Sequence, residues 1–362
     1  MSNSFCRYLS NGYSFVLKSD DTLTVKPCCW FTQEIPVDSA LQDNRKKLFE
    51  SITDWSPACN KCFLLEKSAQ QSLRQTGPDW VSDTESSQDP VTIDIHLDNQ
   101  CNAACVICNQ GNSSLWAKEQ SKLQNKKIAI NPTSPITAID KIVSTVSLEK
   151  VKYIKFFGGE PLFTDTHLRF LEQVTHPEQV TLHYTTNGSI YPNEEVLNVW
   201  KKFKLIIFAA SIDGIEEQFD YIRWPLTWNK VSKNLLRIRD NKNIQNLIFR
   251  IEFTANFLNA YYFDRLEAWV QDNLSTNAYG DKTDLNIHLY FGNVWNLNKM
   301  PSEIRNLIFK KYSKDHRIYK IVNNSSVADL GNWKNFVATW DTRRNNSWKT
   351  AFPDLIDYIQ TK

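Results

Sequence analysis

Apolar and polar positions alternate along several short runs in the second part of the chain, and helical stretches separate these runs. The strand-like runs lie at residues 91–97, 151–157, 180–186, 204–210, 247–255 and 285–291. Strands that are separated by helices predict parallel βα units. In the first run Ile93 and Ile95 face one way, whereas Asp94 and His96 face the other. The apolar faces need helices over them, so we predict that the polar faces line the concave side of the sheet.

A polar inner face argues against a closed barrel, because an eight-stranded barrel fills its interior with packed side chains. The pattern therefore predicts the α/β class, with a partial (β/α)6 TIM-like barrel around a ligand-filled cavity. Four polar residues on the last two strands form a candidate catalytic and substrate-binding wall: Arg250, Glu252, His288 and Tyr290. Alternatively, Arg250 and Glu252 pair only with each other. Residues 300–362 read as helical and are expected to cover the barrel, with a substrate lid as the alternative.

The amino-terminal part has a different pattern. A β-hairpin is predicted where Phe15–Leu17 and Leu23–Val25 flank a polar turn, and a helix is predicted over residues 40–52. The hairpin would bring Cys6 and Cys28 together, and the helix would return the chain toward Cys59. Residues 63–90 are polar and rich in Ser and Asp, which is typical of a linker.

Composition narrows the class of protein. The 362 residues are 41% hydrophobic and 23% charged, which is typical of a globular protein, and the net charge of +2 gives no clear signal for a nucleic-acid or membrane partner. No apolar run approaches the roughly 18 residues of a membrane span. Residues 1–7 lack the basic and apolar pattern of a signal peptide. We therefore expect a cytoplasmic protein.

The cysteines are confined to the first third of the chain, at positions 6, 28, 29, 59, 62, 101, 105 and 108. In a chain without an export signal, clustered cysteines favour metal ligation over disulfides. Inert buried thiols are the alternative, and the Cys59-x2-Cys62 pair also fits half of a zinc site. Cys101, Cys105 and Cys108 can hold one face of a cubane iron–sulfur cluster and leave one iron without a protein ligand. That open iron would be a chemical site.

With this C-x3-C-x2-C motif the sequence resembles the radical S-adenosylmethionine (SAM) superfamily over roughly residues 90–300. Three further segments follow in the order expected of that family: Gly158-Gly159-Glu160-Pro161, Thr185-Thr186-Asn187-Gly188 and Ser211-Ile212-Asp213-Gly214. The resemblance implies that Cys101, Cys105 and Cys108 bind a 4Fe–4S cluster that cleaves SAM. One departure is Ile107, where the family usually has an aromatic side chain beside the adenine.

The resemblance also implies a SAM site. Its residues would be Gly158, Gly159, Glu160, Asn187, Ser211, Asp213 and Arg223. In the family the glycine-rich strand end binds the SAM amino group through its backbone, and polar residues at later strand ends hold the ribose and the carboxylate. The favoured role of Arg223 is a surface salt bridge, and the alternative is that it meets the SAM carboxylate.

The amino-terminal cysteines resemble the twitch or SPASM auxiliary-cluster module, although in many relatives that module follows the barrel. This implies a second 4Fe–4S cluster on Cys6, Cys28, Cys59 and Cys62, with Cys29 as the spare thiol and zinc as the alternative metal. Leu23 stands where the module usually has a glycine. The expected domains are the module at 1–66, a linker at 67–90, the barrel at 91–299 and the helical cover at 300–362.

The resemblance implies an enzyme that removes a hydrogen atom from its substrate with a 5′-deoxyadenosyl radical. An oxidative modification of a peptide is the favoured reaction, and an electron donor such as flavodoxin or ferredoxin would be its partner. The alternatives are a dehydrogenase or isomerase that tailors a small molecule or nucleotide, and a non-catalytic zinc or iron–sulfur protein.

Overall fold

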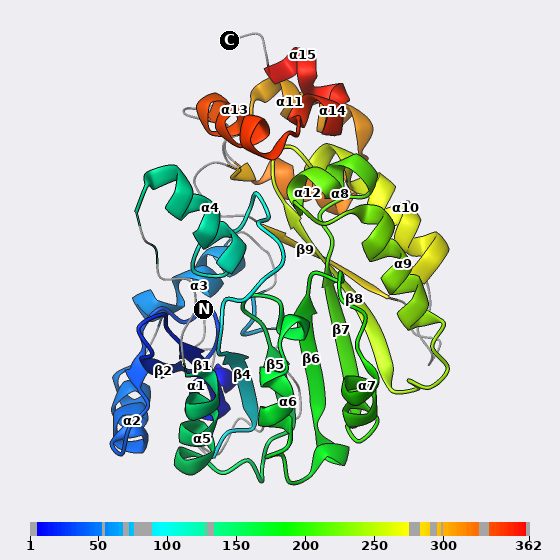
Figure 1. Ribbon diagram of the computed structural model, residues 1–362. Helices are drawn as coiled ribbons and strands as arrows, with labels where there is room; N and C mark the ends of the chain where they lie inside the picture. The colour runs from blue at the N-terminus through cyan, green and yellow to red at the C-terminus, as the bar shows by residue number, and fades with distance from the viewer. Residues whose placement is uncertain are drawn as a thin grey trace. The chain divides into compact units, whose positions relative to one another are not determined.

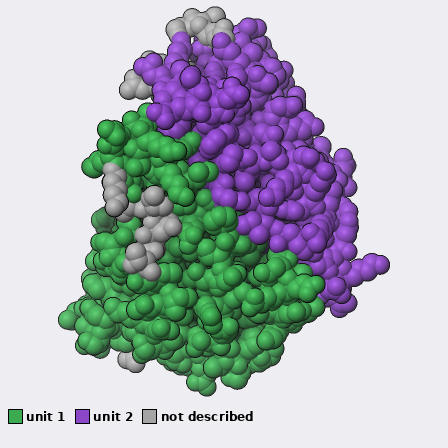
Figure 2. Space-filling model, in the orientation of Figure 1, with its two compact units in different colours: residues 1–101, 110–185, 192–207 green, residues 102–109, 186–191, 208–362 purple. Residues whose placement is uncertain are grey.

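The computed structural model describes residues 6–52, 55–67, 72–75, 89–126, 128, 134–274, 283–289, 295–297, 300–325 and 333–359. The chain forms two compact units, which Figure 2 shows in different colours. The first comprises residues 1–101, 110–185 and 192–207, and the second comprises residues 102–109, 186–191 and 208–362. This division differs from the four segments expected from the sequence. Within the described part of the chain, no helix is long and apolar enough to cross a membrane.

The first unit contains the start of the predicted parallel sheet. β4 (Thr92–His96), β5 (Tyr153–Phe156) and β6 (Thr181–Thr186) pair in parallel and lie side by side in Figure 1. Asp94 lies opposite Lys155, and Lys155 lies opposite His183. The alternate positions Ile93, Ile154 and Leu182 are fully buried. One face of these strands is therefore polar and the other is packed, as the alternation predicts.

An amino-terminal ribbon extends the same sheet. β1 (Gly12–Leu17) and β2 (Leu23–Lys26) form the predicted hairpin, with Leu17 opposite Leu23, and β3 (Ile35–Pro36) pairs with β2. β1 also pairs in parallel with β4, so the order in this unit is β3-β2-β1-β4-β5-β6. The sequence does not show this last pairing. The hairpin continues the sheet that carries β4.

Seven α-helices and three short 3-10 helices accompany these strands in the described residues of the first unit. They are α1 (Arg7–Asn11), α2 (Leu41–Ser51), η1 (Pro57–Cys59), α3 (Asn60–Lys67), α4 (Ser114–Gln124), α5 (Pro135–Thr145), η2 (Pro161–Phe163), α6 (Thr166–Leu171), η3 (Pro177–Gln179) and α7 (Glu194–Trp200). α2 confirms the helix that the sequence predicts over residues 40–52. α3 reaches Lys67, so the first residues of the expected linker stretch are helical.

β7 (Leu205–Ser211) passes from the first unit into the second, which also holds β8 (Leu247–Ala255) and β9 (Asp284–Leu289) as a parallel pair. Along β8, buried residues alternate with half-buried ones such as Arg250 and Glu252. The helices between these strands are α8 (Glu216–Ile222), α9 (Trp228–Arg239), η4 (Ala260–Tyr262) and α10 (Phe263–Leu274). All six predicted strands are present, which confirms the α/β class with a parallel sheet.

The carboxyl-terminal part of the second unit is helical, as expected. Its elements are α11 (Ser302–Lys311), α12 (Arg317–Asn323), α13 (Trp333–Arg344), α14 (Trp348–Ala351), η6 (Pro353–Leu355) and α15 (Ile356–Ile359). Gln218 on α8 donates to the Ala351 carbonyl oxygen at 2.6 Å, and the Tyr221 hydroxyl donates to Asp341 at 2.9 Å. Through these bonds the tail packs on α8, within the same unit.

A buried histidine predicts how stability responds to acid. The His167 side chain is buried, and its Nδ1 lies 3.0 Å from the Thr164 carbonyl oxygen. Burial lowers the pKa of His167 from 6.5 to about 4. The unfolded chain takes up this proton near pH 6.5 and the folded chain only near pH 4, so the free energy of unfolding falls as the pH is lowered through this window. Above about pH 6.5 the contribution of His167 to the free energy of unfolding is fully present.

We expect His167→Phe to flatten that fall, because phenylalanine keeps the ring contacts with Phe156 and Tyr184 but cannot titrate. Urea unfolding of parent and variant across the same pH window measures the two slopes. Identical slopes would contradict the prediction.

Candidate functional site

Cys101 belongs to the first unit and follows β4. The Cys101 N–H donates to Ser114 Oγ at 3.1 Å, and the Ser114 N–H donates to the Asn99 carbonyl oxygen at 2.7 Å. Ser113 caps α4 by accepting from the Trp116 N–H at 3.1 Å. The start of α4 therefore fixes the backbone on which Cys101 lies.

Cys105 and Cys108 belong to the second unit. The Cys108 N–H donates to the Cys105 carbonyl oxygen at 2.9 Å, which closes a turn between the two thiols. The Ala104 and Val106 N–H groups donate to the Trp224 and Ile222 carbonyl oxygens at 2.7 and 2.8 Å. Burial raises the pKa of Cys108 to about 12. A thiol in such surroundings becomes a thiolate only when a bound cation compensates for the lost water.

A buried ion pair lies against Cys105. Arg223 Nη1 donates to Cys105 Sγ at 3.7 Å, and Arg223 Nη2 lies 2.6 Å from Asp213 Oδ2. The side chains of Arg223 and Asp213 are 11% and 0% exposed. The favoured prediction of a surface salt bridge for Arg223 is therefore wrong, because its salt bridge to Asp213 is buried. Burial opposes its charge, but Asp213 outweighs that effect and raises the pKa of the guanidinium, so Arg223 is a cation at neutral pH.

The glycine-rich loop after β5 packs against the segment that leads to Cys101. A Cβ atom at Gly159 would lie 2.1 Å from the Gln100 carbonyl oxygen, and one at Gly158 would lie 2.3 Å from the His96 ring. Gly158 also has a φ of +129°, which L side chains rarely adopt. The Glu160 N–H donates to the Gln100 carbonyl oxygen at 2.7 Å. The sequence predicts that these glycines allow a ligand to approach closely. In the structure they also allow close approach of the protein's own residues, Gln100 and His96.

The other expected SAM residues lie at strand ends in the second unit. Asn187 Nδ2 donates to Asn102 Oδ1 at 2.9 Å, and Asn102 Nδ2 donates to Ser189 Oγ at 2.8 Å. Asp213 Oδ1 accepts the Thr254 N–H at 2.7 Å, while Ser211 ends β7 and is half-buried. Asn187 and Asp213 thus both hold the loop that carries Cys105, directly or through Arg223. Their role in binding SAM stays a prediction.

A hydrogen-bond donor without a partner, beside Cys105, supports the binding of an anionic group there. Arg223 Nε is buried and has no hydrogen-bond partner among the described residues. It lies on a guanidinium that already contacts Cys105. A buried N–H in this position suits an anionic ligand or a cluster sulfur.

The candidate substrate wall forms two cross-strand pairs in the second unit. Arg250 Nη2 lies 3.4 Å from Asp284 Oδ2, and Glu252 accepts from Asn286 Nδ2 at 3.3 Å and bonds to His288. This follows the parallel register, in which Arg250 is opposite Asp284. The alternative that Arg250 and Glu252 pair only with each other is wrong. Asp284 is a partner that the sequence reasoning missed, and Tyr290 lies outside the described residues.

The amino-terminal cysteines come from four short segments of the first unit. Cys6 precedes α1, and Cys28 follows β2 after Pro27. A Cβ atom at Gly12 would lie 2.3 Å from the Pro27 carbonyl oxygen, so glycine allows the α1–β1 junction to approach the end of β2. The Thr32 N–H donates to the Ala58 carbonyl oxygen at 3.2 Å, which joins the Cys28 loop to η1 beside Cys59.

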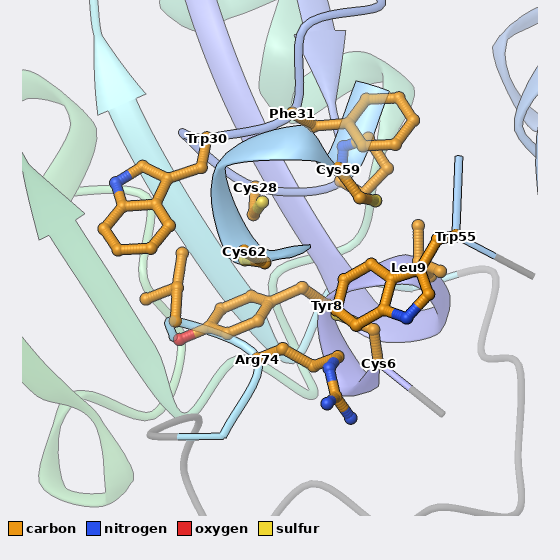
Figure 3. Close-up of a pocket in the computed structure, with 12 residues that line it drawn as sticks. Cys6, Tyr8, Leu9, Cys28, Trp30, Phe31, Trp55, Cys59, Cys62 and Arg74 are labelled. Atoms are coloured by element: carbon orange, nitrogen blue, oxygen red, sulfur yellow. The ribbon is translucent and has the colours of Figure 1, made fainter. Parts of the chain in front are cut away.

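These four cysteines line one cavity, which Figure 3 shows together with the rings of Tyr8 and Trp55 and the Arg74 side chain. Cys29 is not among the lining residues, and its N–H donates to Asp94 Oδ2 at 3.2 Å. Burial raises the pKa of Cys59 to about 11. Four thiols around one cavity are a donor set that suits a 4Fe–4S cluster. The lining residues that the sequence did not predict include Tyr8, Trp55 and Arg74, and Arg74 lies within the stretch predicted as a linker.

All eight cysteines are free thiols. Among the described residues, no three His, Cys, Asp or Glu side chains converge on a position for a single metal ion, whereas the cysteines of a 4Fe–4S cluster each bind a different iron.

The contact at Gly159 leads to a prediction about iron. Gly159→Ala would push the Gln100 carbonyl group away and displace Cys101. We expect the variant to lose iron from the Cys101/Cys105/Cys108 group as well as affinity for SAM, measured by iron analysis and SAM titration. Gly188→Ala is a control for backbone strain without a backbone clash: Gly188 has a φ of +72°, but a methyl group there meets only side-chain atoms, the nearest at 3.2 Å, so iron should remain. Parental iron content in Gly159→Ala would show that this reading of the loop is wrong.

Residues 96–251 match the family model of the radical SAM superfamily. No curated protein matches this chain. Among solved structures, native anSMEcpe with bound AdoMet is 15% identical, with 71% of this chain and 68% of that chain covered and a TM-score of 0.43. Streptococcus suis SuiB bound to S-adenosylmethionine is 12% identical, with 96% and 74% covered and a TM-score of 0.36. The matched residues begin on β4 and end on β8, and they contain Cys101, Cys105 and Cys108, so this chain carries a domain of the radical SAM superfamily.

Proposed function

We propose that the protein is a radical SAM enzyme that carries out an oxidative modification of a peptide with the help of a second iron–sulfur cluster. One observation carries this proposal. Cys6, Cys28, Cys59 and Cys62 line a single cavity, in a chain whose radical SAM domain contains three other cysteines. A redox-neutral reaction needs no second group of iron ligands, whereas an oxidation needs an acceptor for the electron that remains after hydrogen abstraction.

The cofactors would supply the difficult chemistry. SAM and its cluster, when bound, provide a 5′-deoxyadenosyl radical that takes a hydrogen atom, and a second cluster provides a one-electron acceptor. The protein holds the ligands: Cys101 in the loop after β4, bonded to the start of α4, and Cys105 and Cys108 on a loop fixed to Ile222 and Trp224. Gly158, Gly159, Glu160, Asn187 and Ser211 are the proposed residues around SAM.

Substrate binding is assigned to the polar edge formed by β8 and β9. Arg250 Nε is buried without a hydrogen-bond partner among the described residues, although Arg250 Nη2 pairs with Asp284. Glu252 and His288 form a second pair, which could hold or move a proton. Peptide maturation is common among enzymes with a twitch or SPASM module, and this resemblance supports a peptide over a small molecule. Flavodoxin or ferredoxin would suit as the electron donor.

Metal analysis tests the second cluster. Anaerobically reconstituted protein should hold about eight irons per chain, and Cys59→Ala/Cys62→Ala should hold about four. The variant should still cleave SAM, because the ligands of the first cluster are intact, but it should not complete an oxidation. About four irons and one zinc in the parent would remove the oxidative mechanism, since zinc does not change oxidation state.

The three cysteines of the C-x3-C-x2-C motif form the matched set. Cys101→Ala, Cys105→Ala and Cys108→Ala should each abolish formation of 5′-deoxyadenosine while about four irons remain in the amino-terminal group. Cys29→Ala is the control, because Cys29 does not line the cavity, and it should retain both metal contents. A Cys105→Ala enzyme that forms 5′-deoxyadenosine at the parental rate would refute the assignment.

The substrate wall gives a separate prediction. Arg250→Ala should leave SAM cleavage intact while product formation falls by about tenfold or more, the loss typical of a charged hydrogen bond to a substrate. Asp284→Asn removes the partner of Arg250 but leaves the guanidinium, so it should lower product formation less. Both activities are followed in one assay by chromatography of 5′-deoxyadenosine and product. Equal loss of both activities in Arg250→Ala would assign it a folding role.

A further inference from the structure

The Asp213–Arg223 pair has a geometry that the binding of SAM does not require. Arg223 contacts the Cys105 thiol through one nitrogen and Asp213 through another, at 3.7 and 2.6 Å. Both side chains are buried in the second unit. The guanidinium therefore links a carboxylate at the end of β7 to a cysteine of the C-x3-C-x2-C motif.

We propose that Arg223 and Asp213 are positioning residues that set the reduction potential of the cluster on Cys101, Cys105 and Cys108. Arg223 donates an N–H to the Cys105 sulfur and favours the reduced cluster. Asp213 holds the guanidinium in place and offsets part of its charge. This inference rests on the proposed function, because it requires a cluster at these cysteines.

The sign of the effect follows from charge. One-electron reduction adds a negative charge to a cluster, so a nearby cation favours the reduced form and a nearby anion favours the oxidised form. Burial strengthens both effects, because little water screens them. The guanidinium contacts the sulfur directly, whereas Asp213 reaches it only through Arg223. Arg223 therefore raises the potential, and Asp213 lowers it by a smaller amount.

The pair is held in a fixed position. Asp213 Oδ1 accepts the Thr254 N–H at 2.7 Å, and the Asp213 carbonyl oxygen accepts from Asn259 Nδ2 at 3.1 Å. The segment around Arg223 is joined to the cysteine loop by the bonds from Ala104 and Val106 to Trp224 and Ile222. A donor held from both sides keeps its distance to the sulfur, which an effect on potential requires.

Redox titration of the complete, reconstituted enzyme tests the proposal. The electron paramagnetic resonance signal of this cluster is the one that Cys101→Ala/Cys105→Ala/Cys108→Ala lacks. At a fixed applied potential, Arg223→Met should lower the ratio of reduced to oxidised cluster by about tenfold, which corresponds to about 59 mV for one electron. Asp213→Asn should raise the same ratio. Arg223→Lys keeps the charge but not the planar fork and should lie between parent and Arg223→Met.

The opposite signs separate this role from a structural one. If the variants only loosened the loop, the reduction potentials of Arg223→Met and Asp213→Asn would shift in the same direction. That result would overturn the proposal. Asp213→Asn/Arg223→Met leaves no unpaired buried charge, so it keeps the test available if a single variant fails to fold, and its potential should lie between those of the single variants. A double variant with the potential of Arg223→Met would also overturn the proposal.

Arg45→Met is the matched control. Arg45 is 8% exposed, close to the 9% of Arg223, and it donates to the Gly12 carbonyl oxygen at 3.1 Å in the first unit. The potential of the cluster should not change in this variant, and an equal shift would overturn the proposal. A parent enzyme without iron at Cys101, Cys105 and Cys108 would overturn the proposed function and this inference together. Iron bound there with unchanged potentials in Arg223→Met and Asp213→Asn would overturn the inference alone.

Discussion

Burial of thiols is the constraint on which both cysteine groups depend. A sulfur taken out of water resists ionisation, as the raised pKa values of Cys59 and Cys108 show. Each group has an arginine close to it. Arg223 contacts Cys105, and Arg74, held by Glu66, lines the cavity of the amino-terminal cysteines. Each arginine is itself paired with a carboxylate, and the attraction between the two charges offsets part of the desolvation cost of burying the arginine.

Close approach of backbone segments is the second requirement. Gly159 lets the loop after β5 rest on the residues before Cys101, and Gly12 lets α1 rest on the end of β2 before Cys28. In both places a Cβ atom would come within 2.3 Å of a carbonyl oxygen. The cysteines are thus positioned by contacts between backbones, which tolerate less adjustment than contacts between flexible side chains.

The sequence predicts most of the fold because the information is local. Alternation in β4 and β8, the hairpin of β1 and β2 and the helical tail all follow from short patterns. The pairing of β1 with β4 does not, because no local pattern specifies which edge a hairpin joins. The same limit applies to the sites. The spacing of Cys101, Cys105 and Cys108 predicts that they bind a cluster. It cannot show that Arg223 lies beside Cys105 or that Arg250 faces Asp284.

The β1–β4 pairing also connects the amino-terminal cysteines to Cys101 within the first unit. The Cys29 N–H bonds to Asp94 on β4, and the same strand leads directly to Cys101. A chain segment from Asp94 to Cys101 spans at most about 25 Å when fully extended. Asp94 lies in the middle of β4, between β1 and β5, so the sheet fixes one end of this segment. The amino-terminal hairpin is therefore held to the strand before Cys101 by main-chain hydrogen bonds, and a flexible linker alone would not provide that constraint.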